Sequence, residues 1–287
     1  YSLGKSGKPR EAEWTTLAAV VIEEDNRFYV ACLATGTKCT TGERSKLQNV
    51  IIDCHAESLC KRAFKKFLCH HFLNGHSVDG LKFHLFISQL PCGVIERYRG
   101  AVDKDNEQIG IQRKPGKGEK CEKASCVDKI AKWNILGFQG RRLLAITKKP
   151  IKFDSIVIGN CTEKPEYNGK RFRACLTIDK YQIDPNQNKI IKSEITNMFP
   201  LNYCPSLHFN ENFRESIFTR RESVNASNSA IVFWKENGST NMVDVVVNGF
   251  KQGVTRKEVT KKLLRISKQT LTSDIDRLFD VKKDHDL

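Results

Sequence analysis

Hydrophobic residues in the first part of the chain form short β-branched runs around one long helical pattern. The apolar runs 17–22 and 28–33 are separated by a polar segment, a pattern typical of a β-hairpin. Residues 56–72 carry apolar side chains close to helical spacing, and 81–90 has the composition of a strand. The intervening residues 35–49 are rich in Thr, Gly and charge, so we expect a loop there.

The rest of the chain continues this alternation after one long charged segment. Residues 99–123 hold many Lys, Glu and Gly with little periodicity, which predicts a long surface loop. Helices are predicted over 126–138 and 255–279, and strands over 155–159, 230–234 and 243–247. Strands that alternate with helices indicate an α/β core. Because no linker-like stretch divides the chain, we expect a single domain over residues 1–287.

The composition limits the class of protein. The chain has 287 residues, 39% of them hydrophobic, which suits a packed core and is too much for a disordered chain. No apolar run approaches the roughly 20 residues of a membrane span, so no membrane association is expected. Nothing at the start resembles a secretory signal, and we expect an intracellular protein, nuclear or cytoplasmic. Lys and Arg number 48 against 33 Asp and Glu, and this net charge of +15 favours a polyanionic partner.

The 11 cysteines contain no Cys-x-x-Cys pair. This spacing excludes a zinc finger and a thioredoxin-like motif. A secreted disulfide scaffold would be shorter and richer in Cys. We therefore expect most of the cysteines to be reduced and buried as small hydrophobic side chains.

A His-x-Glu motif, from His55 to Glu57, stands at the start of the first predicted helix. In zinc deaminases a His binds the metal, and a Glu two residues later moves protons without being a ligand. A Pro-Cys pair that ends at Cys92 follows the predicted strand 81–90, where such enzymes carry their next zinc ligand. His55, Glu57 and Cys92 are therefore candidate members of a zinc site.

The third zinc ligand does not follow the common Pro-Cys-x-x-Cys spacing, because Ile95 stands at that position. A catalytic zinc needs three protein ligands and one open position. Cys126 begins the next predicted helix, whereas Cys121 lies in the charged segment. Helix placement favours Cys126, and Cys121 is the alternative.

Two further blocks are rich in uncommon residues. Residues 114–119 read Lys-Pro-Gly-Lys-Gly-Glu, and 125–140 begin Ser-Cys-Val-Asp-Lys-Ile-Ala-Lys-Trp-Asn. With Thr-Gly-Thr-Lys-Cys at 35–39 and Val-Ile-Gly at 157–159, these blocks resemble the catalytic domain of RNA adenosine deaminases. The resemblance covers nearly the whole chain. It implies an α/β fold with a cytidine-deaminase-like mixed sheet, helices on both faces and a C-terminal helical extension.

The resemblance also implies a ligand set and a reaction. In this family the Cys of the 125–140 block is the third ligand, so His55, Cys92 and Cys126 would hold one catalytic zinc. The reaction is hydrolytic deamination of adenosine to inosine. Glu57 would take a proton from the attacking water and deliver it to the base and to the leaving ammonia.

Two branches of the family share these blocks, the editors of double-stranded RNA and the deaminases specific for tRNA. The blocks at 7–9, 13–21, 247–253 and 265–268 resemble the tRNA-specific type. This resemblance implies a tRNA partner, and as the target the adenosine just 3′ of the anticodon of alanine tRNA. No obligate protein partner is expected from the sequence. Editing of double-stranded RNA is the alternative. An inactive RNA-binding homologue would have lost a zinc ligand or the Glu, and neither is lost.

Contacts to the substrate are expected from two places. Thr37 and Lys38 match family positions that contact the target nucleotide. The cations that precede Cys126 are expected to form a rim that contacts phosphates. They are Arg113, Lys114, Lys117, Lys120 and Lys123. Such a rim and the net charge of +15 argue against a deaminase of free cytidine, which is small and neutral.

Several cations are expected to point inward from the helices that carry the zinc ligands. By helical spacing Arg62 returns to nearly the face of His55, and Lys132 is expected to point inward with Lys129. Burying several like charges requires a counter-anion, and the resemblance implies that this anion is inositol hexakisphosphate. Its expected contacts are Asp53, Lys61, Arg62, Lys129, Lys132, Trp133 and Lys268. Asp53 and Lys129 are expected to link the anion to the zinc site by hydrogen bonds.

Overall fold

The structure is a computed structural model, and it describes residues 7–10, 13–93, 123–160, 206–209, 225–236, 241–255 and 258–285. The helices are η1 (Gly42–Lys46, a 3-10 helix), α1 (Ala56–Leu73), α3 (Cys126–Leu136), α4 (Arg141–Thr147) and α7 (Lys268–His285). The strands are β1 (Glu13–Trp14), β2 (Leu17–Glu24), β3 (Arg27–Thr35), β4 (Thr37–Cys39), β5 (Asp53–His55), β6 (Lys82–Gln89), β7 (Ser155–Asn160), β8 (Ser206–Phe209), β9 (Asn225–Ala226), β10 (Ser229–Lys235), β11 (Asn241–Val247) and β12 (Phe250–Lys251).

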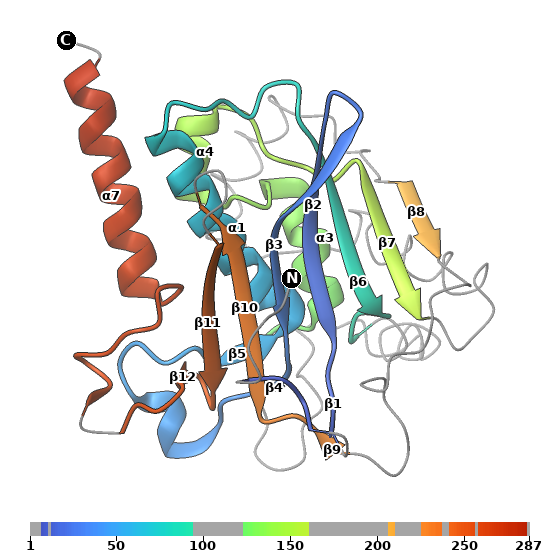
Figure 1. Cartoon of the computed structure of the whole chain (residues 1–287), viewed down its shortest axis with the longest axis vertical. Coiled ribbons are helices and arrows are strands. Elements are labelled where there is room, and N and C mark those ends of the chain that lie inside the picture. The colour runs from blue at the N-terminus through green and yellow to red at the C-terminus, as the bar shows by residue number, and fades with distance from the viewer. Residues whose placement is uncertain are drawn as a thin grey trace, which may run out of the picture.

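One mixed sheet of eight strands forms the centre of the fold, in the order β12-β11-β10-β3-β2-β6-β7-β8 (Figure 1). Neighbouring strands from β12 to β6 run antiparallel, and β7 and β8 continue the sheet parallel to β6. The short pairs β1–β9 and β4–β5 lie at the lower end of this sheet in Figure 1. The predicted α/β class and mixed sheet are confirmed.

The predicted hairpin is confirmed by the antiparallel pair β2 and β3. Asp25 and Asn26 form its turn with φ angles of 48° and 61°. A two-residue turn whose twist matches the strands requires this left-handed conformation, which Asp and Asn tolerate better than most residues. The turn residues thus fix the register that places alternate residues of β2 in the core.

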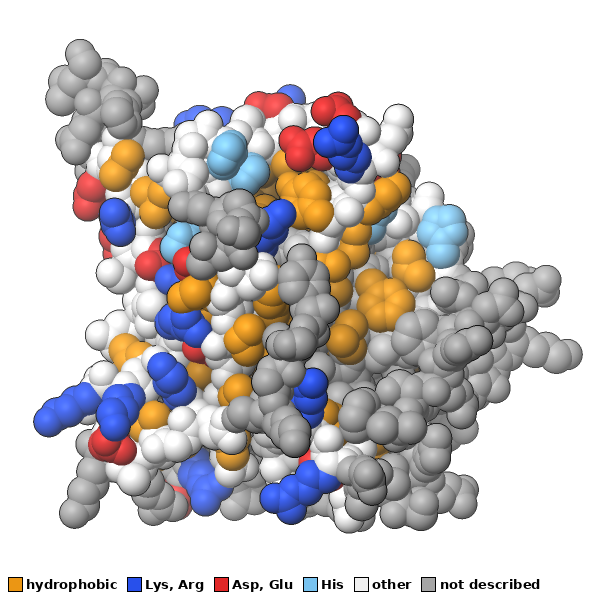
Figure 2. Space-filling view, in the orientation of Figure 1, with side chains coloured by type: hydrophobic (Ala, Val, Ile, Leu, Met, Phe, Trp, Pro, Cys, Tyr) orange, Lys and Arg blue, Asp and Glu red, His pale blue; other side chains and the backbone are white. Residues whose placement is uncertain are grey.

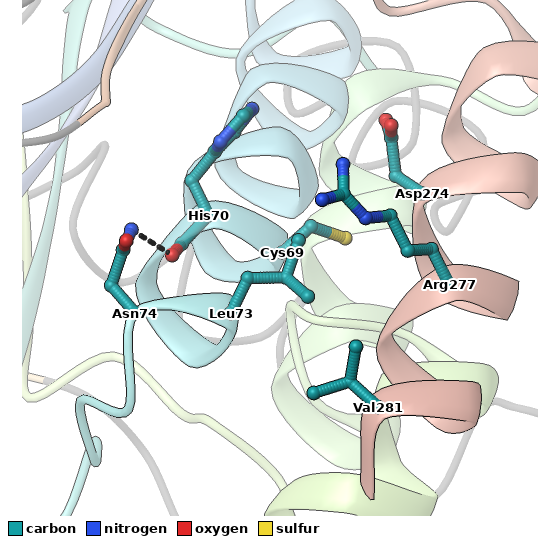
Figure 3. A pocket seen from close by; sticks show the side chains of 7 residues that line it. All are labelled: Cys69, His70, Leu73, Asn74, Asp274, Arg277 and Val281. Atoms are coloured by element: carbon teal, nitrogen blue, oxygen red, sulfur yellow. Dashed lines mark hydrogen bonds between the residues drawn. The ribbon is translucent and has the colours of Figure 1, made fainter. Parts of the chain in front are cut away.

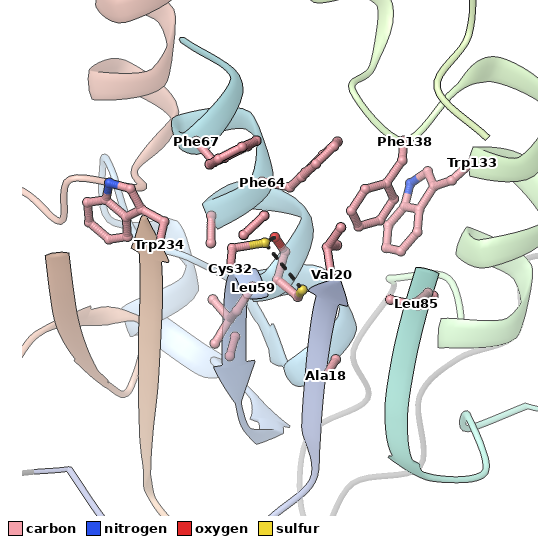
Figure 4. Packing of buried hydrophobic residues seen from close by; sticks show 14 of the residues in the cluster. Ala18, Val20, Cys32, Leu59, Phe64, Phe67, Leu85, Trp133, Phe138 and Trp234 are labelled. Carbon is pink, nitrogen blue, oxygen red and sulfur yellow. Dashed lines mark hydrogen bonds between the residues drawn. The ribbon is translucent and has the colours of Figure 1, made fainter. Parts of the chain in front are cut away.

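The core lies between the sheet and the helices behind it in the view of Figure 1. Figure 4 shows Phe64 of α1 against Phe138, with ring centroids 5.2 Å apart, and Trp133 of α3 packs on Phe138 at 5.3 Å. Alternate strand residues such as Val20 and Leu85 face these rings and are fully buried. Among the described residues the helices pack on this face of the sheet, so the expectation of helices on both faces is met on one of them.

α7 packs against α1 through apolar residues and ion pairs. The Lys66 ammonium, in a side chain only 8% exposed, lies 2.5 Å from a carboxylate oxygen of Asp274. Arg142 of α4 pairs with Asp276. Since loss of one partner of a buried ion pair leaves an uncompensated charge, the Lys66–Asp274 pair fixes how α7 docks.

Two segments differ from the sequence-based prediction. Residues 35–49 are not all loop, because they contain β4 and η1. The helix predicted over 255–279 was placed too early and begins only at Lys268. The predicted loop 99–123 lies outside the described residues, apart from Lys123.

Side-chain contacts explain the late start of α7. The Asp244 carboxylate accepts hydrogen bonds from the backbone N and the Nε of Arg265, at 2.7 and 2.9 Å. Arg62 donates to the backbone oxygen of Ile266 at 3.1 Å, and Ser267 Oγ accepts from the backbone N of Thr270. These contacts hold the residues before Lys268 in turns, and the Ser267 hydroxyl caps the helix.

The cysteines in the described ranges form no disulfide with one another, and most of them are buried, as the sequence predicts. The thiols of Cys32 and Cys60 lie 3.8 Å apart in the core (Figure 4). No helix within the described ranges has the length and apolar character needed to cross a membrane.

Gly36 joins β3 to the β4–β5 hairpin. Its φ is +138°, and a Cβ at this position would lie 2.1 Å from the backbone oxygen of Cys54. The Gly36 carbonyl accepts a hydrogen bond from the backbone N of Ala56, the first residue of α1, at 2.9 Å. The close approach that only glycine permits therefore ties the start of α1 to the end of the sheet.

We expect Gly36→Ala to lower the free energy of unfolding by more than about 2 kcal/mol, because a backbone clash adds to the strain of a positive φ. Gly75→Ala is the matched control, since Gly75 has a φ of +76° with nothing within 4 Å of its Cβ position. That control should cost about 1 kcal/mol from backbone strain alone. Urea unfolding measures both, and equal losses would contradict this account of Gly36.

Candidate metal centre and catalytic site

Three donor atoms predicted from the sequence come together in space. Nδ1 of His55 lies 3.5 Å from Sγ of Cys126 and 3.8 Å from Sγ of Cys92. All three donors lie within 4.8 Å of one another. A tetrahedral zinc with ordinary Zn–S and Zn–N bonds would place its nitrogen and sulfur ligands about 3.6 Å apart. The arrangement therefore fits one metal ion with room for a fourth ligand.

The N-terminal ends of two helices position His55 and Cys126. His55 ends β5 and is the N-cap residue of α1, while Cys126 is the first residue of α3. Ser125 caps α3, because its hydroxyl accepts a hydrogen bond from the backbone N of Asp128. Backbone N–H groups at helix N-termini carry partial positive charge, which favours the thiolate form of a nearby Cys.

The segment after β6 brings Cys92 to the start of α3. The backbone N of Val127 donates to the Cys92 carbonyl at 3.1 Å, and the backbone N of Cys126 donates to Cys92 Sγ at 3.3 Å. Gly93 makes this approach possible, since its φ is +97° and a Cβ there would lie 2.4 Å from Ser125 Oγ. Cys121, the alternative ligand, lies outside the described residues.

Glu57 lies in the first turn of α1, two residues after His55, and is only 3% exposed. A carboxyl group is rarely so buried unless it has a specific role or partner. Its place on the same helix start as the first donor is what the His-x-Glu motif predicts. Glu57 therefore shares the helix start that carries the first donor, and it is not one of the three converging donors.

Asp53 organises the back of the site. Its Oδ1 accepts the backbone N–H of His55 at 3.1 Å, and its Oδ2 accepts the Ser58 hydroxyl at 2.6 Å. The Lys129 ammonium pairs with the same carboxylate and donates to Ser58 Oγ at 3.2 Å. The structure thus brings together Asp53 and Lys129, which the sequence placed in one network.

A second group of donors, Cys39, Asp53 and His55, is also compact enough for a metal ion. Asp53 is already engaged by Lys129 and Ser58, so a metal there would displace an ion pair. His55 belongs to both groups. The arrangement with Cys92 and Cys126 therefore fits a zinc ion better, because thiolate and imidazole are the ligands that zinc prefers.

Thr37 and Lys38 lie beside His55, since β4 pairs with β5 and Thr37 is opposite His55 in register. The two residues line a cleft with Ser227 and Asn228. Lys38 is exposed and donates to Asn228 Oδ1 at 2.5 Å. The buried Oγ1 of Thr37 has no hydrogen-bond partner among the described residues. A hydroxyl in this state is suited to meet a polar group of a ligand.

The cations predicted to contact the anion differ in how exposed they are. Lys61 and Arg62 are partly buried, and the Lys61 ammonium lies 4.5 Å from the ring centroid of Trp133. Lys132 and Lys268 are exposed, so the predicted inward direction of Lys132 is wrong. The large side chain of Trp133 takes the inward position next to it, and Lys132 remains close enough to Lys61 to lower its pKa further.

A separate pocket lies between the C-terminal end of α1 and the middle of α7 (Figure 3). Its lining includes Cys69, Leu73 and Arg277. At 1.5 Å per residue along α1, Cys69 lies roughly 20 Å from His55. Burial raises the pKa of the Cys69 thiol to about 12, which makes it a poor nucleophile at neutral pH. This pocket is therefore no part of the metal centre.

Sequence reasoning missed the backbone features that assemble the site. It gave no role to Gly36 or Gly93, and it did not pair Thr37 with His55. One of these features did have a sequence signal. Ser125 and Asp128 have the spacing of a capping box, which marks the start of α3. The β4–β5 pairing has no comparable local signal.

Comparisons with known proteins agree with this geometry. A family model for the adenosine-deaminase (editase) domain matches residues 32–79 and 95–287. The chain is 29% identical to tRNA-specific adenosine deaminase 1 of Drosophila melanogaster, over 94% of this chain and 77% of that protein. It is 25% identical to the protein of the same name from Schizosaccharomyces pombe, over 96% of this chain and 82% of that protein.

The chain is also similar to editors of double-stranded RNA. It is 26% identical to double-stranded RNA-specific editase B2 of Rattus norvegicus, over 70% of this chain and 34% of that protein. The chain thus spans about a third of the length of that relative. The matched ranges of the family model contain His55, Glu57 and Cys126. Cys92 lies in the short gap between the two ranges.

We expect Cys92→Ala and Cys126→Ala each to reduce bound zinc from about one per chain to near none, because a catalytic site has only three protein ligands. Cys39→Ala and Cys121→Ala should keep the metal. Elemental analysis of the purified proteins measures this. Loss of zinc from the Cys39 or the Cys121 variant, with zinc retained by the Cys126 variant, would overturn the assignment.

Proposed function

The chain belongs to the adenosine-deaminase (editase) domain family, and we propose that it is a zinc-dependent enzyme that deaminates adenosine to inosine in tRNA. The observation that carries this proposal is the convergence of the donor atoms of His55, Cys92 and Cys126 at the helix start that also holds the buried Glu57. An adenosine deaminase needs such a group, because water must be activated next to a residue that can move protons.

The residues of the site have three different roles: metal binding, proton transfer and positioning of a ligand. His55, Cys92 and Cys126 would hold the zinc, which supplies a Lewis acid that lowers the pKa of water toward neutrality. Glu57 accepts a first proton from the attacking water and passes it to the adenine ring, and it then moves the second proton, from the newly added hydroxyl group, to the departing amino group. Water and adenosine thus become inosine and ammonia. Asp53 holds the backbone of His55 and keeps the imidazole in place.

Similarity to relatives favours tRNA as the substrate. The tRNA-specific relatives of Drosophila melanogaster and Schizosaccharomyces pombe match 94% and 96% of this chain, against 70% for the editase B2 of Rattus norvegicus. A base must leave its stack to reach a buried metal, and this costs least in a single-stranded loop. An anticodon loop meets that condition. We propose the adenosine just 3′ of the anticodon of alanine tRNA as the target.

Editing of double-stranded RNA is the second candidate function, because the chain also matches editases of that class. Flipping a paired adenosine costs a few kcal/mol more than using one in a loop. Inosine formation in tRNA and in a long RNA duplex, measured side by side, separates the two functions. Activity on the duplex alone would favour the second.

The cleft beside His55 suits a nucleotide. Thr37 Oγ1 is a buried hydroxyl in need of a partner, and Lys38 offers a cation at the rim of the cleft. Further exposed cations lie on the segments next to this cleft, and Figure 2 shows Lys and Arg side chains at the lower end of the molecule, where β4 and η1 lie in Figure 1. They include Arg44, Lys46 and Lys251.

We propose inositol hexakisphosphate as a second, structural cofactor. Burial and the neighbouring cations Lys65 and Lys132 lower the pKa of Lys61 well below its usual value, and burial lowers that of Arg62. Neither side chain has an ion pair with an acid among the described residues. A bound polyphosphate would supply the missing negative charge, so the residues fit the cofactor.

We expect Glu57→Gln to lower the rate of inosine formation by about 10²- to 10⁴-fold, which is the contribution of a positioned acid–base group. Zinc content and tRNA affinity should stay unchanged, because Glu57 is not among the converging donors. Glu43→Gln is the control, since the Glu43 side chain is 80% exposed on η1. Turnover by the Glu57 variant within twofold of the parent would rule out this role.

We expect Lys38→Met to weaken tRNA binding and to reduce the slope of log affinity against log salt by about 1, because one phosphate contact is lost. Lys82→Met is the control. Lys82 is 57% exposed at the start of β6, about 23 Å by strand geometry from Gln89, the end of the strand that leads to Cys92. Fluorescence anisotropy over a salt series measures both variants. An unchanged slope for Lys38→Met would refute the phosphate contact.

A further inference from the structure

A cluster of cations on α1 contains Lys65 in addition to Lys61 and Arg62, which the sequence predicts as anion contacts. Lys65 lies four residues after Lys61 and three after Arg62, so it is a neighbour of both on the helix surface. The Lys61 ammonium lies over the rings of Trp133 and Phe138, at 4.5 and 5.6 Å from their centroids. This contact fixes where the cluster meets α3 and the segment after it.

Lys65 extends the cluster toward α4. Its Nζ lies against Gly140, where a Cβ would come within 3.0 Å of it. Lys65 is partly buried, and its charged neighbours include the cations Arg62 and Arg142. Burial, followed by these cations, lowers its pKa. In the part of the chain that the structure describes, no carboxylate pairs with it.

Two neighbouring cations, unlike Lys61 and Lys65, have carboxylate partners among the described residues. Lys66, the next residue, pairs with Asp274, and Arg142 pairs with Asp276. Both acids come from α7, which contacts α1. On that side the described chain supplies a carboxylate for each of these two cations. On the side of Lys61 and Lys65 the described residues supply aromatic rings and more cations.

We propose that Lys65 is a direct contact of the bound polyphosphate, so that the cation cage extends from the Lys61–Trp133 contact to Gly140. This inference rests on the cofactor part of the proposed function. It does not depend on which RNA is the substrate. A compact anion with several phosphates fits because Lys61 and Lys65 of α1 lie close to Lys132 of α3, and Lys61 lies over the Trp133 ring of the same helix.

The sign of the stability change separates this role from a merely buried lysine. A partly buried cation without a counter-ion opposes folding, so its replacement by an apolar side chain of similar length raises stability. A cation that binds a phosphate does the opposite, and its loss weakens both the anion and the fold. Lys65→Met therefore raises the melting temperature in the first case and lowers it in the second.

The experiment compares the purified parent with Lys65→Met, Lys65→Arg and the control Lys149→Met, which makes the same charge change at an exposed residue. Inositol hexakisphosphate is released by acid and measured by mass spectrometry per chain, and melting temperatures are recorded. Affinity is measured by adding inositol hexakisphosphate back to stripped protein. We expect Lys65→Met to bind it roughly 10- to 100-fold more weakly, as for one lost charge-assisted hydrogen bond. Its melting temperature should fall, while Lys65→Arg and Lys149→Met stay near the parent.

Two results would overturn the inference. One is Lys65→Met with unchanged cofactor content and affinity, and the other is Lys65→Met with a raised melting temperature. If Lys65→Met yields no folded protein, Lys65→Gln takes its place, because it also removes the charge and is judged by the same two results. Inosine formation by the parent is measured separately. A parent that carries the polyphosphate but does not deaminate tRNA would refute the proposed reaction and leave the role of Lys65 intact.

Discussion

The site depends on two helix starts that meet at one end of the sheet. His55 occupies the N-cap position of α1 and Cys126 is the first residue of α3, and their donor atoms lie 3.5 Å apart. At a helix start the backbone N–H groups have no helical partners, and their partial positive charge stabilises negative ligands. Cys92 benefits directly, because the Cys126 backbone N donates to its sulfur. The same constraint thus gathers the donors and favours the thiolate form that binds zinc.

The helix that carries His55 also carries a cluster of cations, so the metal centre and this charge cluster share one element. The helix carries the first donor at its start and a cation cluster one to three turns later. Two cations on the side toward α4 and α7, Lys66 and Arg142, are matched by acids of α7. Lys61 and Lys65 are not matched by acids in the described ranges. An anion bound to them would brace α1 against α3 and hold His55 in place, so folding and catalysis would share one ligand.

Elements with their own periodicity could be predicted from the sequence. The β2–β3 hairpin and α1 fall close to the predicted boundaries, and His55, Cys92 and Cys126 come together as expected. Features that depend on distant partners could not be predicted. α7 starts late because Asp244 holds Arg265, and the Nζ of Lys65 lies against Gly140, 75 residues later in the chain. No local pattern contains either contact.

X-ray absorption at the zinc edge tests the central claim most directly, because it counts ligands by type in the intact protein. A site made by His55, Cys92 and Cys126 predicts two sulfur neighbours at about 2.3 Å and two light neighbours near 2.0 to 2.1 Å. One light neighbour is the imidazole and the other is solvent. Cys126→Ala should remove this spectrum. Four sulfur neighbours, or a zinc with only oxygen and nitrogen neighbours, would contradict the account.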